Sequence, residues 1–180
     1  MTLIENNAGV AVFGGGCFWC TEAVFGEFNG VVSVVPGFAG GHIENPTYYE
    51  VCRESTGHAE VVKIEFDPTV ISYGKLLEVF FKTHDPTTLN RQGADSGTRY
   101  RSIILYTNVE QREQAVSFIA QLDASGMRIV TEVVAFGKFY EAEEEHKDFY
   151  KRNPDMMYCQ IVIQPKLDKV RGEFSVLLGN

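Results

Sequence analysis

The stretch VAVFGGGCFWCTEAVF, residues 10–25, decides how this chain begins to fold. Its first four residues form a short apolar run rich in β-branched side chains, which predicts a buried strand that ends at the three glycines. From Cys17 onward, apolar residues recur on one broad face of a helix. Glycines allow a tight turn from strand to helix and let a ligand approach the backbone. The sequence therefore predicts a strand–turn–helix unit with Cys17 at the start of its helix.

Strand and helix patterns alternate along the rest of the chain without a regular βα repeat. Strands are predicted at 31–38, 59–66, 100–106 and 129–136, and helices at 73–84, at 109–124, in the acidic stretch 140–153 and after Pro165. This pattern favours an α/β protein of the α+β type. We expect a two-layer sandwich in which helices pack on a mixed or antiparallel sheet, with a ferredoxin-like core and long irregular loops. Residues 1–180 are expected to form a single catalytic domain.

Two long segments without a clear period interrupt this pattern, at residues 40–57 and 85–98. Loops of this length inside a compact domain are usually functional. We expect them to converge with the glycine turn at 14–20 on one rim of the sheet, and the chemistry is expected at that rim.

Composition and charge exclude several classes of partner. The 180 residues are 44% hydrophobic, 12% aromatic and 22% charged, which is ordinary for a globular protein. A formal net charge of −8 and the lack of a basic run argue against nucleic acid and against a membrane surface. The N-terminal residues lack the features of a secretory signal, and no apolar run approaches the roughly 20 residues that span a bilayer. We therefore expect a cytoplasmic protein, whose four cysteines are not a disulfide framework.

Cys17 is the residue on which the functional hypotheses depend. A cysteine in the first turn of a helix lies near unpaired N–H groups and the positive end of the helix dipole, and both favour the reactive thiolate. An isolated cysteine is more often a small buried hydrophobe, but the Cys17-x-x-Cys20 spacing recurs in redox and metal sites. The glycines before it match neither the dinucleotide-binding motif nor the P-loop, so no phosphate site is expected.

A zinc-binding module and a general Cys-x-x-Cys thiol–disulfide oxidoreductase are the alternatives. Zinc would take Cys17, Cys20 and His58 as ligands, but structural zinc sites normally use four Cys or His ligands in paired clusters. His146 stands beside three glutamates and is expected on a solvated helix face. We therefore expect no metal.

The residues near the expected rim suit the reduction of a sulfoxide. A thiolate can attack the electrophilic sulfur, and the oxygen leaves readily only when it is protonated or strongly hydrogen-bonded. Such a site needs a nucleophilic cysteine, a proton donor, hydroxyl groups and an apolar cup. The chain offers these groups in Cys17, Glu60, Tyr48, Tyr49, Tyr100, Phe18 and Trp19.

Five ordered blocks of the sequence resemble the signature of class A peptide methionine sulfoxide reductases. They are GCFWC, NPTYYEVC, STGHAEVVKIEFDP, HDPTTLNRQGADSGTRYRS and NPDMMYCQIVIQPKL, and the resemblance extends from about Val10 to about Phe174. It implies reduction of the S-epimer of methionine sulfoxide, free or in proteins, since each epimer has its own enzyme. It also implies no bound cofactor, and thioredoxin or dithiothreitol as the reductant.

The resemblance implies a role for each matching residue. Cys17 would be the nucleophile that becomes a sulfenic acid, and Glu60 the proton donor, kept protonated by burial against aromatic rings. The remaining assignments are Tyr48 and Tyr100 as hydrogen-bond donors to the sulfoxide oxygen, Phe18 and Trp19 around the methyl group, and Asp95 on the polar side of the pocket. Without the resemblance, both tyrosines are more typical of ordinary half-buried structural positions than of a catalytic site.

The recycling thiol is left open between Cys20 and Cys159. Many members of the family that this chain resembles carry glycine where it has Cys20, and a subgroup carries cysteine there. Cys20 can attack the sulfenic acid of Cys17 and form a disulfide that thioredoxin reduces. Cys159, in MMYC, also resembles a recycling position of the family. We favour Cys20, because two thiols on one helical turn need little rearrangement to meet.

Overall fold

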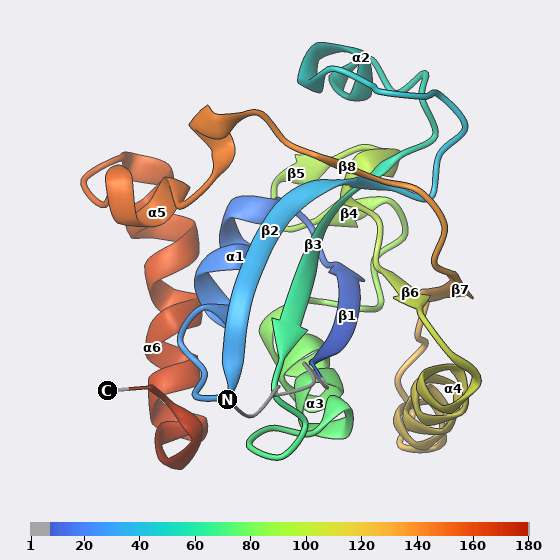
Figure 1. The fold of residues 1–180 in the computed structure, drawn as a ribbon, viewed down its shortest axis with the longest axis vertical. Coiled ribbons are helices and arrows are strands. Elements are labelled where there is room, and N and C mark those ends of the chain that lie inside the picture. The colour runs from blue at the N-terminus through green and yellow to red at the C-terminus, as the bar shows by residue number, and fades with distance from the viewer. Residues whose placement is uncertain (1–7, 180) are drawn as a thin grey trace, which may run out of the picture.

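A computed structural model describes residues 8–179 as a curled mixed sheet with helices packed against it (Figure 1). The strands are β1 (Gly9–Gly14), β2 (Val31–Ala39), β3 (Ala59–Phe66), β4 (Arg91–Gln92), β5 (Asp95–Ser96), β6 (Ile103–Tyr106), β7 (Glu132–Ala135) and β8 (Phe139–Glu141). The α-helices are α1 (Phe18–Phe25), α2 (Tyr48–Cys52), α3 (Tyr73–Thr83), α4 (Val109–Ala124), α5 (Phe149–Arg152) and α6 (Gln164–Glu173). Single turns of 3₁₀ helix lie at Thr98–Tyr100, Glu144–His146 and Ser175–Leu177, and a π-helical turn at Cys159–Ile163 leads into α6.

The main sheet has the strand order β7–β6–β1–β3–β2–β8, and β4 and β5 form a separate short pair. Strands β6 and β7 run parallel, whereas the other neighbours in the main sheet run antiparallel. The predicted fold class, a mixed sheet with helices packed on it, is confirmed.

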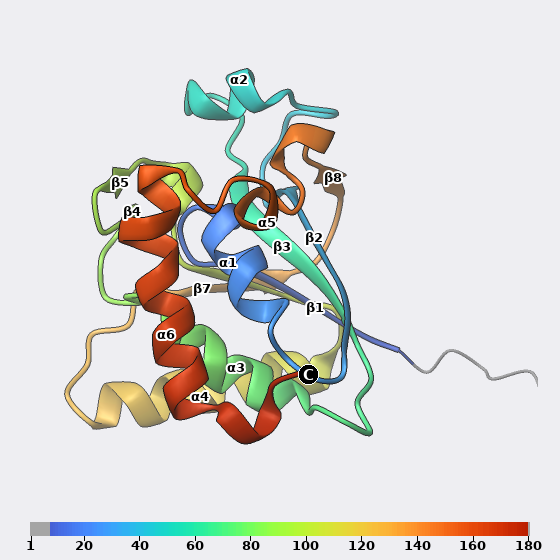
Figure 2. The ribbon, with the colours of Figure 1, turned by 90° about the vertical axis from the view of Figure 1, so that its left-hand side faces the viewer.

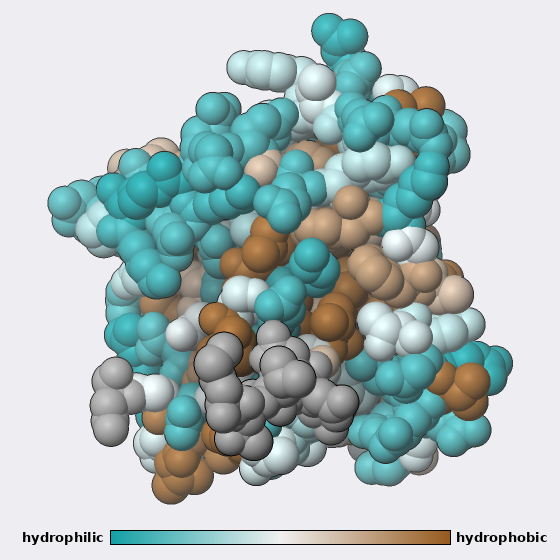
Figure 3. Space-filling model, viewed as in Figure 1, coloured by the Kyte–Doolittle hydropathy of each residue, from teal (hydrophilic) through white to brown (hydrophobic). Residues whose placement is uncertain are grey.

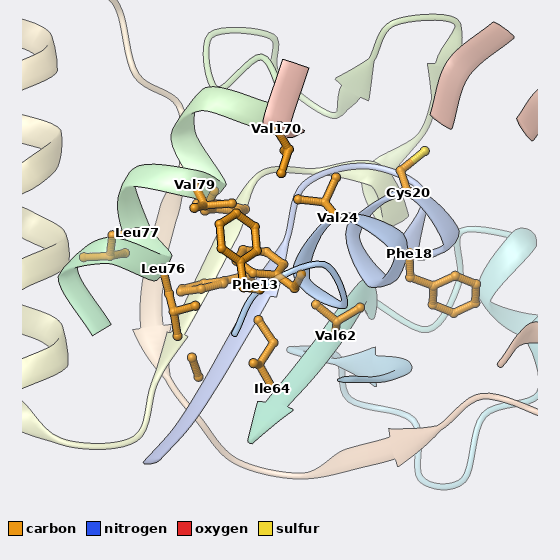
Figure 4. Packing of buried hydrophobic residues seen from close by; sticks show 14 of the residues in the cluster. Phe13, Phe18, Cys20, Val24, Val62, Ile64, Leu76, Leu77, Val79 and Val170 are labelled. Atoms are coloured by element: carbon orange, nitrogen blue, oxygen red, sulfur yellow. The ribbon is translucent and has the colours of Figure 1, made fainter. Parts of the chain in front are cut away.

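Helices α1, α3, α4 and α6 enclose the larger core on one side of the sheet. Figure 2 shows α1 in front of the strands, with α6 beside α1 and α3 below it. Alternation along β1 turns Phe13 toward these helices, where its ring stacks on Phe80 of α3 with 4.9 Å between centroids. The other contributors to this core include Val62, Ile64, Val24, Leu76 and Val170 (Figure 4). Helix α1 is thereby fixed against the sheet along its length.

The opposite face of the sheet carries a smaller apolar cluster. Its buried members are Val12, Ala39, Ala59, Val61, Ile103 and Leu105. On the face seen in Figure 3, apolar side chains show in the middle of the view, framed by hydrophilic residues. Alternate residues of β3 therefore belong to different environments, and Glu60 belongs with Val62 and Ile64 on the helix-covered face.

The register between β1 and β3 brings the glycine turn beside Glu60. Phe13 pairs with Val62 in this antiparallel ladder. Two residues beyond Phe13 the chain is in the glycine turn, and two residues before Val62 it is at Glu60. Strand pairing alone therefore sets the acid opposite the start of α1.

The acidic stretch 140–153 does not form the continuous helix that its sequence predicts. Residues 139–141 join the sheet as β8, residues 144–146 make one 3₁₀ turn, and only α5 is helical thereafter. Asp148 has φ 49°, in the left-handed region, so the backbone turns immediately before α5. Within residues 8–179, no helix has the length and apolar character needed to cross a bilayer.

Candidate active site

The turn between β1 and α1 presents Cys17 at the start of the helix, as the sequence predicts. Gly16 adopts φ +102°, which side-chain-bearing residues rarely adopt, and a Cβ there would lie 2.6 Å from Gln92. A Cβ at Gly14 would lie 2.8 Å from the carbonyl oxygen of Glu60. Glycine at position 14 therefore lets the turn pack closely against β3, and glycine at position 16 lets it pack closely against Gln92 of β4. Cys17 is the N-cap residue of α1, and its carbonyl accepts from the N–H of Cys20 at 3.1 Å.

A pocket of about 60 Å³ opens at this turn. It is lined by Cys17, Phe18, Trp19, Tyr48, Glu60, Asp95, Tyr100 and Tyr158. Every residue to which the resemblance gives a catalytic or substrate-binding role, apart from the two candidate recycling thiols, thus lines one pocket. Tyr49, which the sequence also offered as a hydroxyl group, does not line it and is 77% exposed. Three larger hollows, of about 350, 370 and 500 Å³, lie elsewhere among the described residues, and none of the three has a cysteine in its lining.

Glu60 is a buried carboxyl group at the centre of the pocket. Its side chain is 2% exposed, and its Oε2 accepts from the backbone N–H of Phe18 at 3.1 Å. Burial raises the pKa of Glu60 to about 8, against the opposing effects of the Phe18 N–H and the Arg99 guanidinium. At neutral pH the group is therefore mainly the uncharged acid that a proton donor requires.

Cys17 and Cys20 form a coupled pair of buried thiols. Burial raises the pKa of Cys17, and the neighbouring Cys20 thiol and Glu60 carboxyl raise it further. The hydrogen bond from Cys17 lowers the pKa of Cys20 to about 7. The sequence predicts a lowered pKa for Cys17, and this prediction is wrong. Burial raises the pKa of the thiol by more than the N-terminus of the helix can lower it. A thiol with a raised pKa has to lose its proton before it can act as a nucleophile.

Two tyrosines supply hydroxyl groups to the pocket from separate segments. Tyr48 is the first residue of α2, which begins with a capping box: the N–H of Glu50 donates to Thr47 Oγ1, and the Thr47 N–H donates back to the Glu50 carboxylate. Tyr100 ends the 3₁₀ turn that precedes β6. Burial raises the pKa of both phenols, so each remains a hydroxyl donor.

The apolar wall of the pocket is a stack of aromatic rings. Trp19 lies flat on Phe149, with 3.6 Å between centroids and 4° between planes, and its Nε1–H donates to His146 Nδ1 at 3.2 Å. Phe18 packs between Phe38 and His146. His146 is 6% exposed, so its predicted place on a solvated helix face is wrong. The side chain turns inward because the 3₁₀ turn replaces the predicted helix.

Asp95 and the C-terminal part of the chain complete the polar side. The hydroxyl of Tyr158 donates to Asp95 Oδ2 at 2.9 Å and lies 3.6 Å from Cys20 Sγ. Cys159 follows Tyr158 at the start of the π-helical turn and is fully buried, which raises its pKa. Of the two candidate recycling thiols, Cys20 is the one hydrogen-bonded to Cys17.

Sequence reasoning missed Tyr158, His146 and Arg99. Tyr158 stands beside Cys159 in the quoted MMYC, and Arg99 stands beside Tyr100 in TRYRS, so both were in view without an assigned role. His146 has no such neighbour, and only the tertiary structure brings it to Trp19.

The three ligands of the zinc hypothesis do not come together. Both ring nitrogens of His58 are engaged by the backbone, since Nδ1 accepts from the Gly41 N–H at 3.1 Å and Nε2 donates to the Ile43 carbonyl at 2.7 Å. In the part of the chain that the structure describes, no group of three His, Cys, Asp or Glu side chains could hold a metal ion.

Comparison with known proteins agrees with this geometry. The family model described as peptide methionine sulfoxide reductase matches residues 9–176. A peptide methionine sulfoxide reductase MsrA of Saccharolobus solfataricus is 57% identical over 161 residues, covering 89% of this chain and 91% of that protein. One of Acinetobacter baumannii is 52% identical over 170 residues, covering 94% of this chain and 98% of that protein.

Solved structures of methionine sulfoxide reductases are also similar to this chain. Methionine sulfoxide reductase A of Corynebacterium diphtheriae superposes with a TM-score of 0.76 at 36% identity, covering 84% of this chain and 77% of that one. Mxr1 of Saccharomyces cerevisiae in reduced form gives a TM-score of 0.81 at 29% identity, covering 88% and 92%. Mxr1 has also been solved in complex with Trx2, a structure with a TM-score of 0.58 at 20% identity, covering 83% and 89%.

Proposed function

Because the chain belongs to the peptide methionine sulfoxide reductase family and is therefore an enzyme that reduces methionine sulfoxide with its thiols, we propose that Cys17 is the thiol that attacks the sulfoxide sulfur. The observation that carries this assignment is the pocket in which the Cys17 side chain meets a buried carboxyl group, two phenols and two aromatic rings. This combination matches the requirements of sulfoxide reduction, whereas thiol–disulfide exchange alone needs neither the acid nor the phenols.

The first half-reaction begins when the Cys17 thiol passes its proton to the neighbouring Cys20 thiolate, which is available because the pKa of Cys20 is about 7. When Cys20 holds it, Cys17 is the thiolate that attacks the sulfur. Glu60 gives its proton to the departing oxygen while Tyr48 and Tyr100 donate hydrogen bonds to that oxygen. The Cys17 sulfur bonds to the substrate sulfur, and the protonated oxygen then moves from the substrate sulfur to Cys17 as the bond between the two sulfurs breaks. Methionine leaves, Cys17 becomes a sulfenic acid, and Glu60 is left as a carboxylate. One negative charge thus moves from the sulfur to the carboxyl group.

The pocket also suits the small end of the substrate. The rings of Phe18 and Trp19 form its apolar wall, which would receive the methyl group, and Asp95 lies on the polar side. A volume of about 60 Å³ accommodates the methyl sulfoxide end and leaves the rest of the side chain outside. Free methionine sulfoxide and an oxidised residue in a protein are therefore both proposed substrates, with the S-epimer as the accepted form.

Recycling is proposed to use Cys20. Its thiol attacks the sulfenic acid of Cys17, a disulfide forms between the two sulfurs, and water is released. The lowered pKa of Cys20 and its hydrogen bond to Cys17 support this choice over Cys159, whose pKa burial raises. Thioredoxin is proposed as the reductant of the disulfide, supported by the complex of Mxr1 with Trx2. No bound cofactor is required. A thioredoxin-dependent repair enzyme of this kind would operate in the reducing cytoplasm.

The test is the consumption of separated epimers. A methionine sulfoxide peptide of each configuration is incubated with the protein and dithiothreitol, and methionine is measured. Only the S form should be consumed, and the Cys17→Ser variant should consume neither. Equal use of both epimers would contradict the proposed specificity, and full activity of Cys17→Ser would contradict the nucleophile.

A further inference from the structure

Arg99 lies directly behind two of the three groups assigned above to the sulfoxide oxygen, Glu60 and Tyr100. Its Nη2 donates a hydrogen bond to Tyr100 Oη at 3.0 Å, and its guanidinium carbon lies 4.4 Å from the centroid of that ring. Its Nε lies 3.7 Å from Glu60 Oε1. A single cation therefore contacts the proposed acid and one of the two tyrosines that donate to the oxygen.

The guanidinium is held in this place by the segment that follows α2. Arg99 Nη1 donates to Glu54 Oε1 at 2.7 Å and to the carbonyl of Cys52 at 3.1 Å. The Glu54 carboxylate also accepts from the N–H of Thr98 at 2.5 Å, so it fixes the 3₁₀ turn that carries Arg99. The Arg99 side chain is 18% exposed. Its position is therefore set by several separate contacts, and it is not free to swing into solvent.

The Nε–H of Arg99 is buried and has no hydrogen-bond partner, which is unusual for a buried donor. The protonation of Glu60 accounts for it. Glu60 Oε2 accepts from the Phe18 N–H, so in the uncharged acid the proton belongs on Oε1, the oxygen that faces Arg99. A protonated Oε1 is a poor acceptor, whereas the carboxylate that remains after proton transfer is a strong one.

We propose that Arg99 is a positioning residue of the reductase step, which directs the hydroxyl proton of Tyr100 toward the sulfoxide oxygen and stabilises the Glu60 carboxylate as it forms. Because Tyr100 Oη accepts from Arg99, its own O–H is left to donate into the pocket. As Glu60 Oε1 gives its proton to the sulfoxide oxygen, the Arg99 Nε–H gains a charged acceptor. This contact strengthens during the reaction, which is the condition for lowering the barrier. The inference rests on Glu60 being the acid.

Arg99 supplies the positive charge among the titratable groups around Glu60. The groups that face Glu60 from neighbouring elements are Cys17 and Cys20 of α1, Tyr48 of α2, Asp95 of β5, Tyr100 of the 3₁₀ turn, and Tyr158. Each of these is neutral or negative when it titrates. The pKa of Arg99 itself is raised, so its charge persists at every working pH.

The experiment measures the single-turnover yield and rate of methionine formation with the S-epimer between pH 6 and pH 10, in Arg99→Gln and in a matched control. Arg101→Gln is the control, because Arg101 lies in the same segment and is 12% exposed, but its guanidinium holds the carbonyls of Gly57 and Thr98. Both variants lose a partly buried guanidinium, and only Arg99→Gln loses the contacts to Glu60 and Tyr100.

In Arg99→Gln, the pH above which the rate falls should be higher than in wild type by about one pH unit or more, because no cation then favours the Glu60 carboxylate. The rate at pH 7 should fall roughly tenfold, since a general acid contributes about 10²–10⁴-fold and part of that depends on its conjugate base. Arg101→Gln should keep the wild-type pH dependence. A merely structural role of Arg99 would lower stability without moving the pH profile.

An unchanged pH profile with a rate within twofold of wild type in Arg99→Gln would overturn the inference. Glu60→Gln, run in parallel, separates this failure from failure of the proposed acid. If Glu60→Gln keeps the wild-type rate, both the assignment of Glu60 as the acid and the inference about Arg99 are wrong. If Glu60→Gln is much slower than wild type but Arg99→Gln is unaffected, only the inference about Arg99 is wrong. Should Arg99→Gln not fold, Arg99→Lys decides, because one ammonium cannot reproduce the two-pronged contact. A wild-type rate in that variant would overturn the inference.

Discussion

Replacement of Glu60 by glutamine should stabilise the protein, and the gain should grow with pH. Burial raises the pKa of Glu60 from an ordinary 4.5 to about 8. Between these pH values the unfolded chain carries an ionised carboxylate, while the folded protein retains the proton. Because the folded state binds more protons in this window, the free energy of unfolding falls as the pH rises. The stabilisation that comes from keeping Glu60 protonated in the folded state is therefore fully present near and below pH 4.5 and is lost by about pH 8.

The magnitude follows from the size of the shift. Each unit between the two pKa values corresponds to about 1.4 kcal/mol. Because of Glu60, the free energy of unfolding should therefore fall by roughly 3 kcal/mol between pH 5 and pH 8. The amide in the Glu60→Gln variant does not titrate in either the folded or the unfolded state, so this variant lacks the pH-dependent loss. The difference in unfolding free energy between Glu60→Gln and wild type should therefore increase by that amount over the same range.

Urea denaturation followed by the fluorescence of Trp19, the only tryptophan, measures this difference under reducing conditions. Comparing slopes with pH removes any constant effect of placing the amide beside Arg99. Glu65→Gln serves as the control, because Glu65 lies on the same strand but on the opposite face of the sheet. A difference that changes by less than about 0.5 kcal/mol from pH 5 to pH 8 would refute the reasoning. Glu60 would then ionise normally in the folded protein.

Three further predictions concern the thiols, the acid and the core. Cys20→Ser should release about one equivalent of methionine and then stall with thioredoxin, whereas Cys159→Ser should continue to turn over; unchanged steady-state turnover in Cys20→Ser would exclude it as the recycling thiol. The single-turnover rate of the wild-type enzyme should fall above about pH 8, as Glu60 loses its proton, and a rate that stays level to pH 10 would contradict its role. Phe13→Ala should lower the unfolding free energy by about 3–5 kcal/mol, because its fully buried ring fills the centre of the core. A loss below about 1 kcal/mol in urea denaturation would show that the core closes around the gap.

The parts of the fold that the sequence predicts are those governed by local patterns. The apolar run of β1, the alternation of β3 and the period of α4 each specify their element nearly to the residue. The acidic stretch at 140–153 has an equally clear helical composition, yet residues 139–141 pair with β2 instead. Pairing at a sheet edge depends on which strand lies nearby in the tertiary fold, and the local amino-acid composition does not contain that information.

The site was predictable where its residues belong to one contiguous motif. Cys17, Phe18 and Trp19 follow from the glycine turn, and Glu60 follows from the alternation of β3 once its partner strand is known. The pKa of Cys17 was not predictable, because burial comes from segments distant in sequence. Tyr158 reaches Asp95 across 63 positions of sequence, and Arg99 reaches Glu60 only through the tertiary fold.

The link between Glu60 and the backbone N–H of Phe18 separates reactivity from selectivity. An amide proton is common to every residue except proline, so the spacing of acid and nucleophile is independent of which side chain occupies position 18. If the proposed roles hold, the side chains at positions 18 and 19 can be exchanged while the backbone contact between Phe18 and Glu60 is kept. Substitutions at Phe18 and Trp19 are therefore the natural first choice for enlarging the pocket toward bulkier sulfoxides, because they leave the hydrogen bond between Glu60 and the backbone in place.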